Sequence, residues 1–204
     1  MWTRTTMIGA GALVVLAIST GCSSSDESGH PAGHAPSSST TAAPGTAAAE
    51  AHNDADVTFT QHMIPHHTQA IEMSDTLLAK QGIDPRVTQL ANEIKAAQGP
   101  EIAQMQGWLT QWGSPAMPPM SDHDMAGMTG MMSEHDMTAL KDAQGVEATK
   151  LYLTQMVAHH EGAITMAQAE IKDGRYAPAI ALAHSIATTQ QQEIDTMKGI
   201  LATL

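Results

Sequence analysis

The stretch MIPHHTQAIEM at residues 63–73 returns as MVAHHEGAITM at residues 156–166, with six of eleven positions identical. A second pair of matching segments follows, QGPEIAQM at 98–105 and QQQEIDTM at 190–197. Self-similarity over this length indicates that one supersecondary unit has been duplicated. Because both segments of each unit have helical periodicity, we interpret the unit as a helical hairpin. Adjacent histidines flanked by methionines recur in it and are the first candidates for chemistry.

The hairpins predict an all-α domain over residues 54–204. Repeat 1 covers 54–112, a loop rich in Met and His covers 113–137, and repeat 2 covers 146–204. Apolar residues follow helical spacing over 54–80, from Pro85 to 112, over 146–172, and after Gly174 to 203, and Ser133 is placed to cap a short extra helix. Two hairpins joined by a longer crossover predict an antiparallel four-helix bundle with pseudo-twofold symmetry.

The N-terminal residues have the pattern of an export signal. Arg4 precedes an apolar run over 8–18, small residues follow, and the only cysteine in the chain, Cys22, stands at the expected cleavage point. This arrangement resembles a bacterial lipoprotein signal at 1–21, and an ordinary secretory signal is the alternative. Residues 22–53 are rich in Ser, Ala, Pro, Gly and Thr and predict a flexible tether. We therefore expect an exported protein, anchored through a lipid on Cys22 at the extracytoplasmic face of a bacterial membrane.

The chain is acidic, with a formal net charge of −12. An acidic surface disfavours nucleic acid and anionic lipid as partners and favours attraction of cations. We therefore expect no nucleic-acid partner. The lone cysteine excludes an intramolecular disulfide.

Successive helical residues diverge by about 100°, so the repeat also predicts which side chains point inward. His66 and His159 fall in the inward stripes of the first and third long helices, with His67 and His160 at the edges. Glu101 and Glu193 fall in the inward stripes of the helices that follow. Burying imidazoles and carboxylates is costly unless they pair with each other or bind a metal. A metal site and a satisfied structural network are both open interpretations, and methionines at this spacing are typical of core packing.

The crossover is unusual because seven of the fifteen methionines fall between residues 117 and 137. Pro118, Pro119, Gly127 and Gly130 prevent a continuous amphipathic helix, so we expect these methionines not to be core packing. Thioether sulfur is a soft ligand that suits Cu(I). The residues predicted to capture metal in this loop are Met117, Met120, His123, Met125, Met128, Met131, Met132 and His135. A disordered, oxidation-prone linker is the alternative.

Together, the paired M-x-x-HH-x-x-A-x-x-M segments, the Gly-Met-Met-Ser stretch at 130–133 and the Q-x-x-E-I segments resemble the family named domain of unknown function 305. The resemblance covers about residues 54–204 and implies a ferritin-like fold. Some exported members of that family are implicated in copper binding and resistance, which implies copper as the bound ion here. The ligands that it implies are Met63, His66, His67, Met73, Met156, His159, His160 and Met166, with Glu101 and Glu193 less directly matched.

The leading functional expectation is a lipid-anchored protein that sequesters or transfers copper, chiefly Cu(I), with Cu(II) or another transition metal as further candidates. A copper donor or acceptor protein is the expected partner, and the oligomeric state is left open. One alternative is a ferritin-like di-metal oxidase, but such di-iron sites use Glu-x-x-His. Three residues before His66 and His159 this chain has Met63 and Met156 instead. The other alternative is a metal-free structural or interaction lipoprotein.

Overall fold

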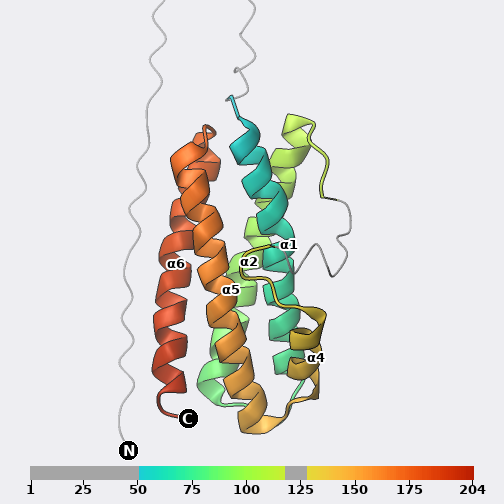
Figure 1. Ribbon diagram of the computed structural model, residues 1–204, viewed down its shortest axis with the longest axis vertical. Helices are drawn as coiled ribbons and strands as arrows, with labels where there is room; N and C mark the ends of the chain where they lie inside the picture. Colours follow the sequence, from blue (N-terminus) through green and yellow to red (C-terminus); the bar gives the residue numbers. More distant parts are fainter. Residues whose placement is uncertain (1–50, 118–127) are drawn as a thin grey trace, which may run out of the picture. The chain divides into compact units, whose positions relative to one another are not determined.

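Figure 1 shows the computed structural model, which describes residues 51–117 and 128–204. Those residues form five helices and no strand, so the predicted all-helical fold is confirmed. The helices are α1 (Asp54–Leu78), α2 (Pro85–Trp112), α4 (Glu134–Asp142), α5 (Gly145–Asp173) and α6 (Ala177–Leu201). The predicted signal peptide, Cys22 and most of the predicted tether lie outside the described residues.

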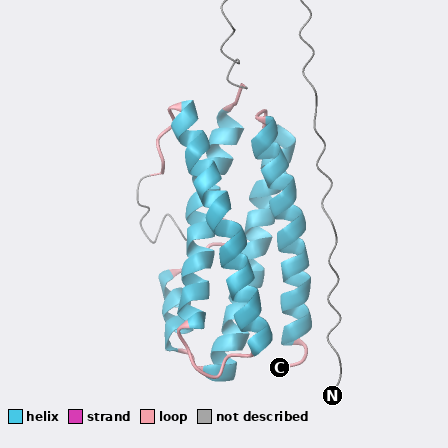
Figure 2. Ribbon diagram, turned by 180° about the vertical axis from the view of Figure 1, so that it is seen from behind, coloured by secondary structure: helices cyan, strands magenta, loops and turns pink. Residues whose placement is uncertain are grey.

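The four long helices lie side by side, as Figures 1 and 2 show from opposite sides. The closest packing is within the two hairpins, α1 with α2 and α5 with α6. Contact between α1 and α5 joins the hairpins, whereas α2 and α6 touch each other much less. The short helix α4 packs against both α1 and α5. The contact between α2 and α6 is therefore the more open of the two junctions between the hairpins.

The helix starts explain how the hairpins are held together at one end. Asn53 caps α1 by accepting hydrogen bonds from the backbone N–H groups of Ala55 and Asp56. The N-cap of α6, Tyr176, makes no side-chain cap. Instead, the Asp56 carboxylate accepts hydrogen bonds from the backbone N–H groups of Arg175 at 3.0 Å and Tyr176 at 2.9 Å. The buried Asp56 carboxylate on α1 thus provides the hydrogen-bond acceptor for the backbone N–H groups at the start of α6.

The end of the predicted tether is in contact with the helices. The His52 ring stacks on Trp112, with centroids 4.6 Å apart and planes inclined by 13°. Trp108 and Tyr176 complete an aromatic group there. The domain's contacts therefore begin before residue 54, the predicted boundary.

Two apolar clusters fill the interior. One includes Met73, Tyr152 and Met156. The other includes Phe59, Met63 and Met105. Along each long helix, a polar segment lies between these clusters, and on α1 and α5 it holds the histidines of the repeat. Pro65 and Pro100 lie within α1 and α2, which continue through them.

Among the residues that the structure describes, no helix combines the length and apolar character needed to cross a membrane.

Candidate metal centre

The middle of the domain holds a contact between two imidazoles from different hairpins. His66 on α1 and His159 on α5 have ring centroids 3.7 Å apart, with planes inclined by 38°. Both side chains are buried, and none of their four ring nitrogens has a hydrogen-bond partner among the described residues. The backbone of Thr129 lies near His66 without meeting hydrogen-bond geometry. Four polar atoms are thus buried without the partners that normally offset their desolvation.

Burial determines the protonation of these two rings. Desolvation, together with repulsion from the neighbouring His67 and His160, lowers the pKa of His66 to about 3. Desolvation also holds the pKa of His159 well below its usual range, with repulsion from His66 contributing. Both imidazoles are therefore neutral near pH 7, which is the state that can donate a lone pair to a metal.

The neighbouring histidine of each pair contacts a carboxylate. Nε2 of His67 lies 2.7 Å from Oε2 of Glu101 on α2, and Nε2 of His160 lies 2.7 Å from Oε2 of Glu193 on α6. Both rings are buried, while the Glu101 and Glu193 side chains are 22% and 15% exposed. When Nε2 donates its proton to the carboxylate, the lone pair is on Nδ1, which has no partner in either ring. Metal-binding histidines usually have this arrangement, with one nitrogen donating to a carboxylate and the other facing the metal.

These six residues are called the polar layer below: His66, His67, Glu101, His159, His160 and Glu193. The prediction that histidines of α1 and α5 and carboxylates of α2 and α6 point inward matches their positions. His67 and His160 were predicted at the edge of the stripe, but they are buried, and they are the partners of the glutamates. Within the described ranges 51–117 and 128–204, no three or more His, Cys, Asp or Glu side chains are arranged to hold a metal ion. The polar layer is therefore a set of contacting pairs, one between two histidines and two between a histidine and a glutamate.

The methionines of the repeat lie mainly in the apolar clusters. Met63, Met73 and Met156 are fully buried there, and Met166 is half-buried against one of them. This placement agrees with the core-packing interpretation of methionines at helical spacing.

Residues 128–133 form a strap that crosses α1 and α5, drawn in yellow in Figure 1. The side-chain Nε2 of Gln69 donates to the backbone carbonyl of Met132 at 2.9 Å, and the side-chain Oε1 of Gln69 accepts from the backbone N–H of Met132 at 2.7 Å. Gly130, with φ of +83°, lies directly against Gly162 of α5, where a Cβ on Gly130 would come within 2.7 Å of the Gly162 Cα. Two facing glycines therefore let the backbone of the strap approach the helix closely.

The strap corrects one prediction. Met131 and Met132 were expected not to be core packing, but they are only 8% and 9% exposed, and Met132 belongs to an apolar cluster. The expectation was wrong because it considered only helical amphipathicity, whereas Gln69 and the glycine contact bury this irregular segment.

The remaining loop residues are spread out. Met117 and Met128 are half-buried and His135 is exposed. The other three, Met120, His123 and Met125, lie outside the described residues.

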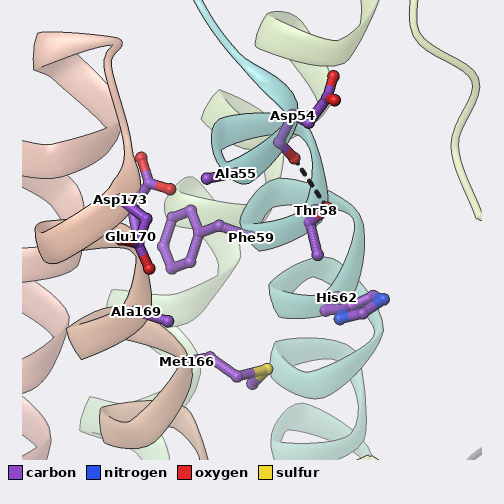
Figure 3. Close-up of a pocket in the computed structure, with 9 residues that line it drawn as sticks. All are labelled: Asp54, Ala55, Thr58, Phe59, His62, Met166, Ala169, Glu170 and Asp173. Carbon is purple, nitrogen blue, oxygen red and sulfur yellow. Dashed lines mark hydrogen bonds between the residues drawn. The ribbon is translucent and has the colours of Figure 1, made fainter.

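A pocket of about 330 Å³ lies between the start of α1 and the end of α5 (Figure 3). Phe59, His62 and Met166 line it, with Glu170 in its wall. Met166 is the one residue of the predicted ligand set that lines it, so this pocket is separate from the polar layer.

Glu170 was missed by the sequence reasoning. It is buried beside Asp56, and desolvation followed by the nearby Asp56 carboxylate raises the pKa of Glu170 to about 8. Desolvation acts to raise the pKa of Asp56, but the nearby Glu170 carboxyl and hydrogen bonds from the backbone N–H groups of Asn53, Arg175 and Tyr176 outweigh it, so the pKa is lowered. Extending the stripe of His159, Ala163 and Met166 by one helical turn reaches Glu170, so helical periodicity could have identified Glu170 as an inward-facing residue.

The fold and the polar layer define a class of all-helical proteins built on a duplicated hairpin with two adjacent histidines in each copy. The family model described as "Domain of unknown function (DUF305)" matches residues 56–201, and the chain belongs to this family. None of the curated proteins matches the chain.

Several solved structures are similar to the chain. A DUF305 fragment from Deinococcus radiodurans is 33% identical, with a TM-score of 0.68 over 74% of this chain and 98% of that one. A DUF305 protein from Streptomyces coelicolor, described as a candidate secreted protein, is 33% identical, with a TM-score of 0.67 over 73% and 93% of the two chains. CopM in a Cu(II)-bound form is 30% identical, with a TM-score of 0.64 over 72% and 96%. CopM is also described in Cu(I)-bound and Ag-bound forms.

Proposed function

We propose that this protein binds copper ions as cargo through the histidines of the polar layer. The observation that carries the proposal is the concentration of six unpaired imidazole nitrogens at the centre of the domain: both in His66, both in His159, and Nδ1 in His67 and His160. Leaving that many buried acceptors and donors without partners is costly unless a ligand takes them up. Imidazole binds both Cu(I) and Cu(II), so the donor set fits copper.

In this proposal the two glutamates orient the neighbouring histidines and do not bind the copper ion themselves. Glu101 and Glu193 each hold one ring nitrogen, which directs Nδ1 of His67 and His160 toward the cargo. His66 and His159 supply neutral nitrogens between them. Rotation of these rings converts the pairs into a shared site. The half-buried sulfur of Met166 and the loop residues serve as weaker, softer sites for Cu(I), apart from the polar layer.

The related structures support the choice of ion. CopM is described with Cu(I), Cu(II) and Ag bound, and it is 28% to 30% identical to this chain. Ag resembles Cu(I) in preferring soft sulfur and nitrogen ligands. The proposal therefore includes Cu(I) first and Cu(II) second.

The cellular part of the proposal rests on the N-terminal sequence. The signal at 1–21 and Cys22 support export and lipid anchoring at the outer face of a bacterial membrane. The candidate secreted relative from Streptomyces coelicolor is in keeping with export. We propose a binding role without catalysis, in which a ferritin-like four-helix bundle sequesters copper or passes it to a partner protein.

An anaerobic Cu(I) titration against a chromogenic chelator tests the proposal on residues 23–204. The core variant is His66→Leu with His159→Leu, and the loop variant is Met120→Ser with His123→Asn and Met125→Ser. His184→Ala changes an exposed histidine outside the polar layer and is the matched control. Circular dichroism verifies that each variant is folded.

We expect the core variant to lose most of its competition with the chelator while the loop variant and the control retain it. Loss in the loop variant alone would make the helices a scaffold. If the unsubstituted protein fails to compete for copper, the proposal is rejected.

A further inference from the structure

Matching residues of the two repeats face each other where α2 meets α6. A narrow pocket there is lined by Gln98 and Glu101 from α2 and by Gln190 and Glu193 from α6, with Ala97, Ile186 and Thr189. It has room for about one water molecule. These four polar residues are called the seam below. The seam adjoins the buried histidines, because Glu101 and Glu193 belong to both the seam and the polar layer and are the partners of His67 and His160.

The two glutamines of the seam are buried without satisfying their carbonyl groups. Gln98 and Gln190 are each 3% exposed, and Oε1 of each has no hydrogen-bond partner among the described residues. An unpaired buried amide oxygen is costly, and here the duplication places two of them at one pocket. Carbonyl and carboxylate oxygens together are typical ligands of divalent cations. The seam therefore has the chemistry of a site for a cation.

The opposite side of the polar layer is closed by backbone. On the α1 and α5 side, the strap is fixed to Gln69, and its Gly130 lies against Gly162. A Cβ on Gly130 would also come within 3.0 Å of the carbonyl oxygens of Ala158 and His159, so that contact leaves little space. On the seam side, the partly exposed carboxylates of Glu101 and Glu193 connect solvent with the buried rings.

We infer that the seam is the route by which a divalent cation, Cu(II) in the first instance, reaches the histidines, with the Gln98 and Gln190 carbonyl oxygens as its first protein ligands. This inference rests on the proposed copper binding and adds the route and two ligands. At the seam, the cation exchanges some of its water ligands for the oxygen atoms of the protein. It then passes to the unpaired Nδ1 of His67 and His160, whose Nε2 atoms stay on their carboxylates. No electron transfer is involved.

The test compares loading rates with equilibrium binding. Cu(II) sulfate is mixed rapidly with the protein, and loading is followed by quenching of tryptophan fluorescence. The seam variant is Gln98→Leu with Gln190→Leu, which keeps side-chain size and removes both carbonyls. Gln155→Leu is the matched control, since Gln155 is also buried with an unpaired Oε1 but donates to the Asp136 carbonyl, away from the seam.

We expect the seam variant to load Cu(II) about tenfold or more slowly, the factor that corresponds to losing one interaction with a charged partner. Its final copper content should equal that of the unsubstituted protein, and the control should load at the normal rate. Equal rates in all three proteins would overturn the seam route while leaving copper binding intact. Failure of the unsubstituted protein to bind copper would instead refute the proposed function and the route with it.

A second measurement needs no variant. Freeze-quenched electron paramagnetic resonance of the unsubstituted protein should show an early protein-bound Cu(II) species with oxygen ligands, distinct from the Cu(II) aqua ion, that converts to one with nitrogen hyperfine structure. Nitrogen coordination from the earliest time point, with no oxygen-ligated precursor, would contradict the inference.

Discussion

Replacing Gly162 with alanine should lift the strap from α5. A Cβ at Gly162 would lie 2.6 Å from the Gly130 Cα and 2.7 Å from the Thr129 carbonyl carbon, and it would meet the Thr129 carbonyl oxygen as well. All three obstacles are backbone atoms, so a change of side-chain rotamer cannot relieve the overlap. The strap must move, and with it the two hydrogen bonds between Gln69 and Met132.

The expected loss of stability follows from these contacts. Two net hydrogen bonds contribute about 2 kcal/mol, and renewed exposure of Met132 costs about 2 kcal/mol. Alanine is favoured over glycine within a helix by about 1 kcal/mol, which partly offsets the loss. Gly162→Ala should therefore lower the free energy of unfolding by about 3 kcal/mol.

Urea unfolding followed by circular dichroism measures this change, and hydrogen exchange at the Met132 amide reports whether the strap has lifted. Gly107→Ala is the matched control, because Gly107 is an exposed residue within α2 with nothing within 4 Å of its added Cβ. That control should gain up to about 1 kcal/mol. If Gly162→Ala is as stable as the unsubstituted protein and its Met132 amide remains protected, the close contact between strap and helix is wrong.

Three other changes address the buried titratable groups of the metal-free protein. Asp56→Ala leaves backbone donors of Arg175 and Tyr176 without an acceptor, and urea unfolding should show a loss of about 2–4 kcal/mol; a loss under about 1 kcal/mol would contradict this. Burial and the Asp56 carboxylate raise the pKa of Glu170 to about 8, so its contribution to the free energy of unfolding is complete below about pH 4.5 and is lost as the pH rises. Between pH 7 and 9 the unsubstituted protein should lose about 1 kcal/mol that Glu170→Gln retains, and parallel pH curves would refute the assignment. The pKa of His66 is lowered to about 3, so its contribution to the free energy of unfolding is present above about pH 6.5 and is lost on acidification. Between pH 8 and 5, the free energy of unfolding of His66→Leu should fall by about 2 kcal/mol less than that of the unsubstituted protein. Equal losses in the two proteins would exclude a buried neutral ring.

The helices and the burial of His66 and His159 follow from periodicity alone, because the apolar stripe and the turn residues agree with each other. The pairing of His67 with Glu101 was harder to predict from the sequence. Helix α1 contacts α2 on one side and α5 on another, so adjacent histidines that diverge by about 100° are buried against different neighbours. A single inward stripe cannot represent a helix that is packed on two sides.

The strap was beyond sequence reasoning for a different reason. Its burial depends on Gln69 and Gly162, which are distant in sequence and belong to no local pattern. The unpaired oxygens of Gln98 and Gln190 suggest a binding role only because the structure places both glutamines at one pocket.

The bond from Asp56 to the start of α6 has a consequence for assembly. At the corresponding place in repeat 2 stands Thr149, whose hydroxyl donates to the Gly145 carbonyl within its own helix. The first hairpin therefore carries an acceptor, Oδ1 of Asp56, whose hydrogen-bond donors come from the turn of the second hairpin, and Thr149 gives the second hairpin no equivalent bond to the first. Two near-copies of one hairpin are thereby made non-interchangeable, which favours pairing of unlike halves within a chain over exchange of like halves between chains.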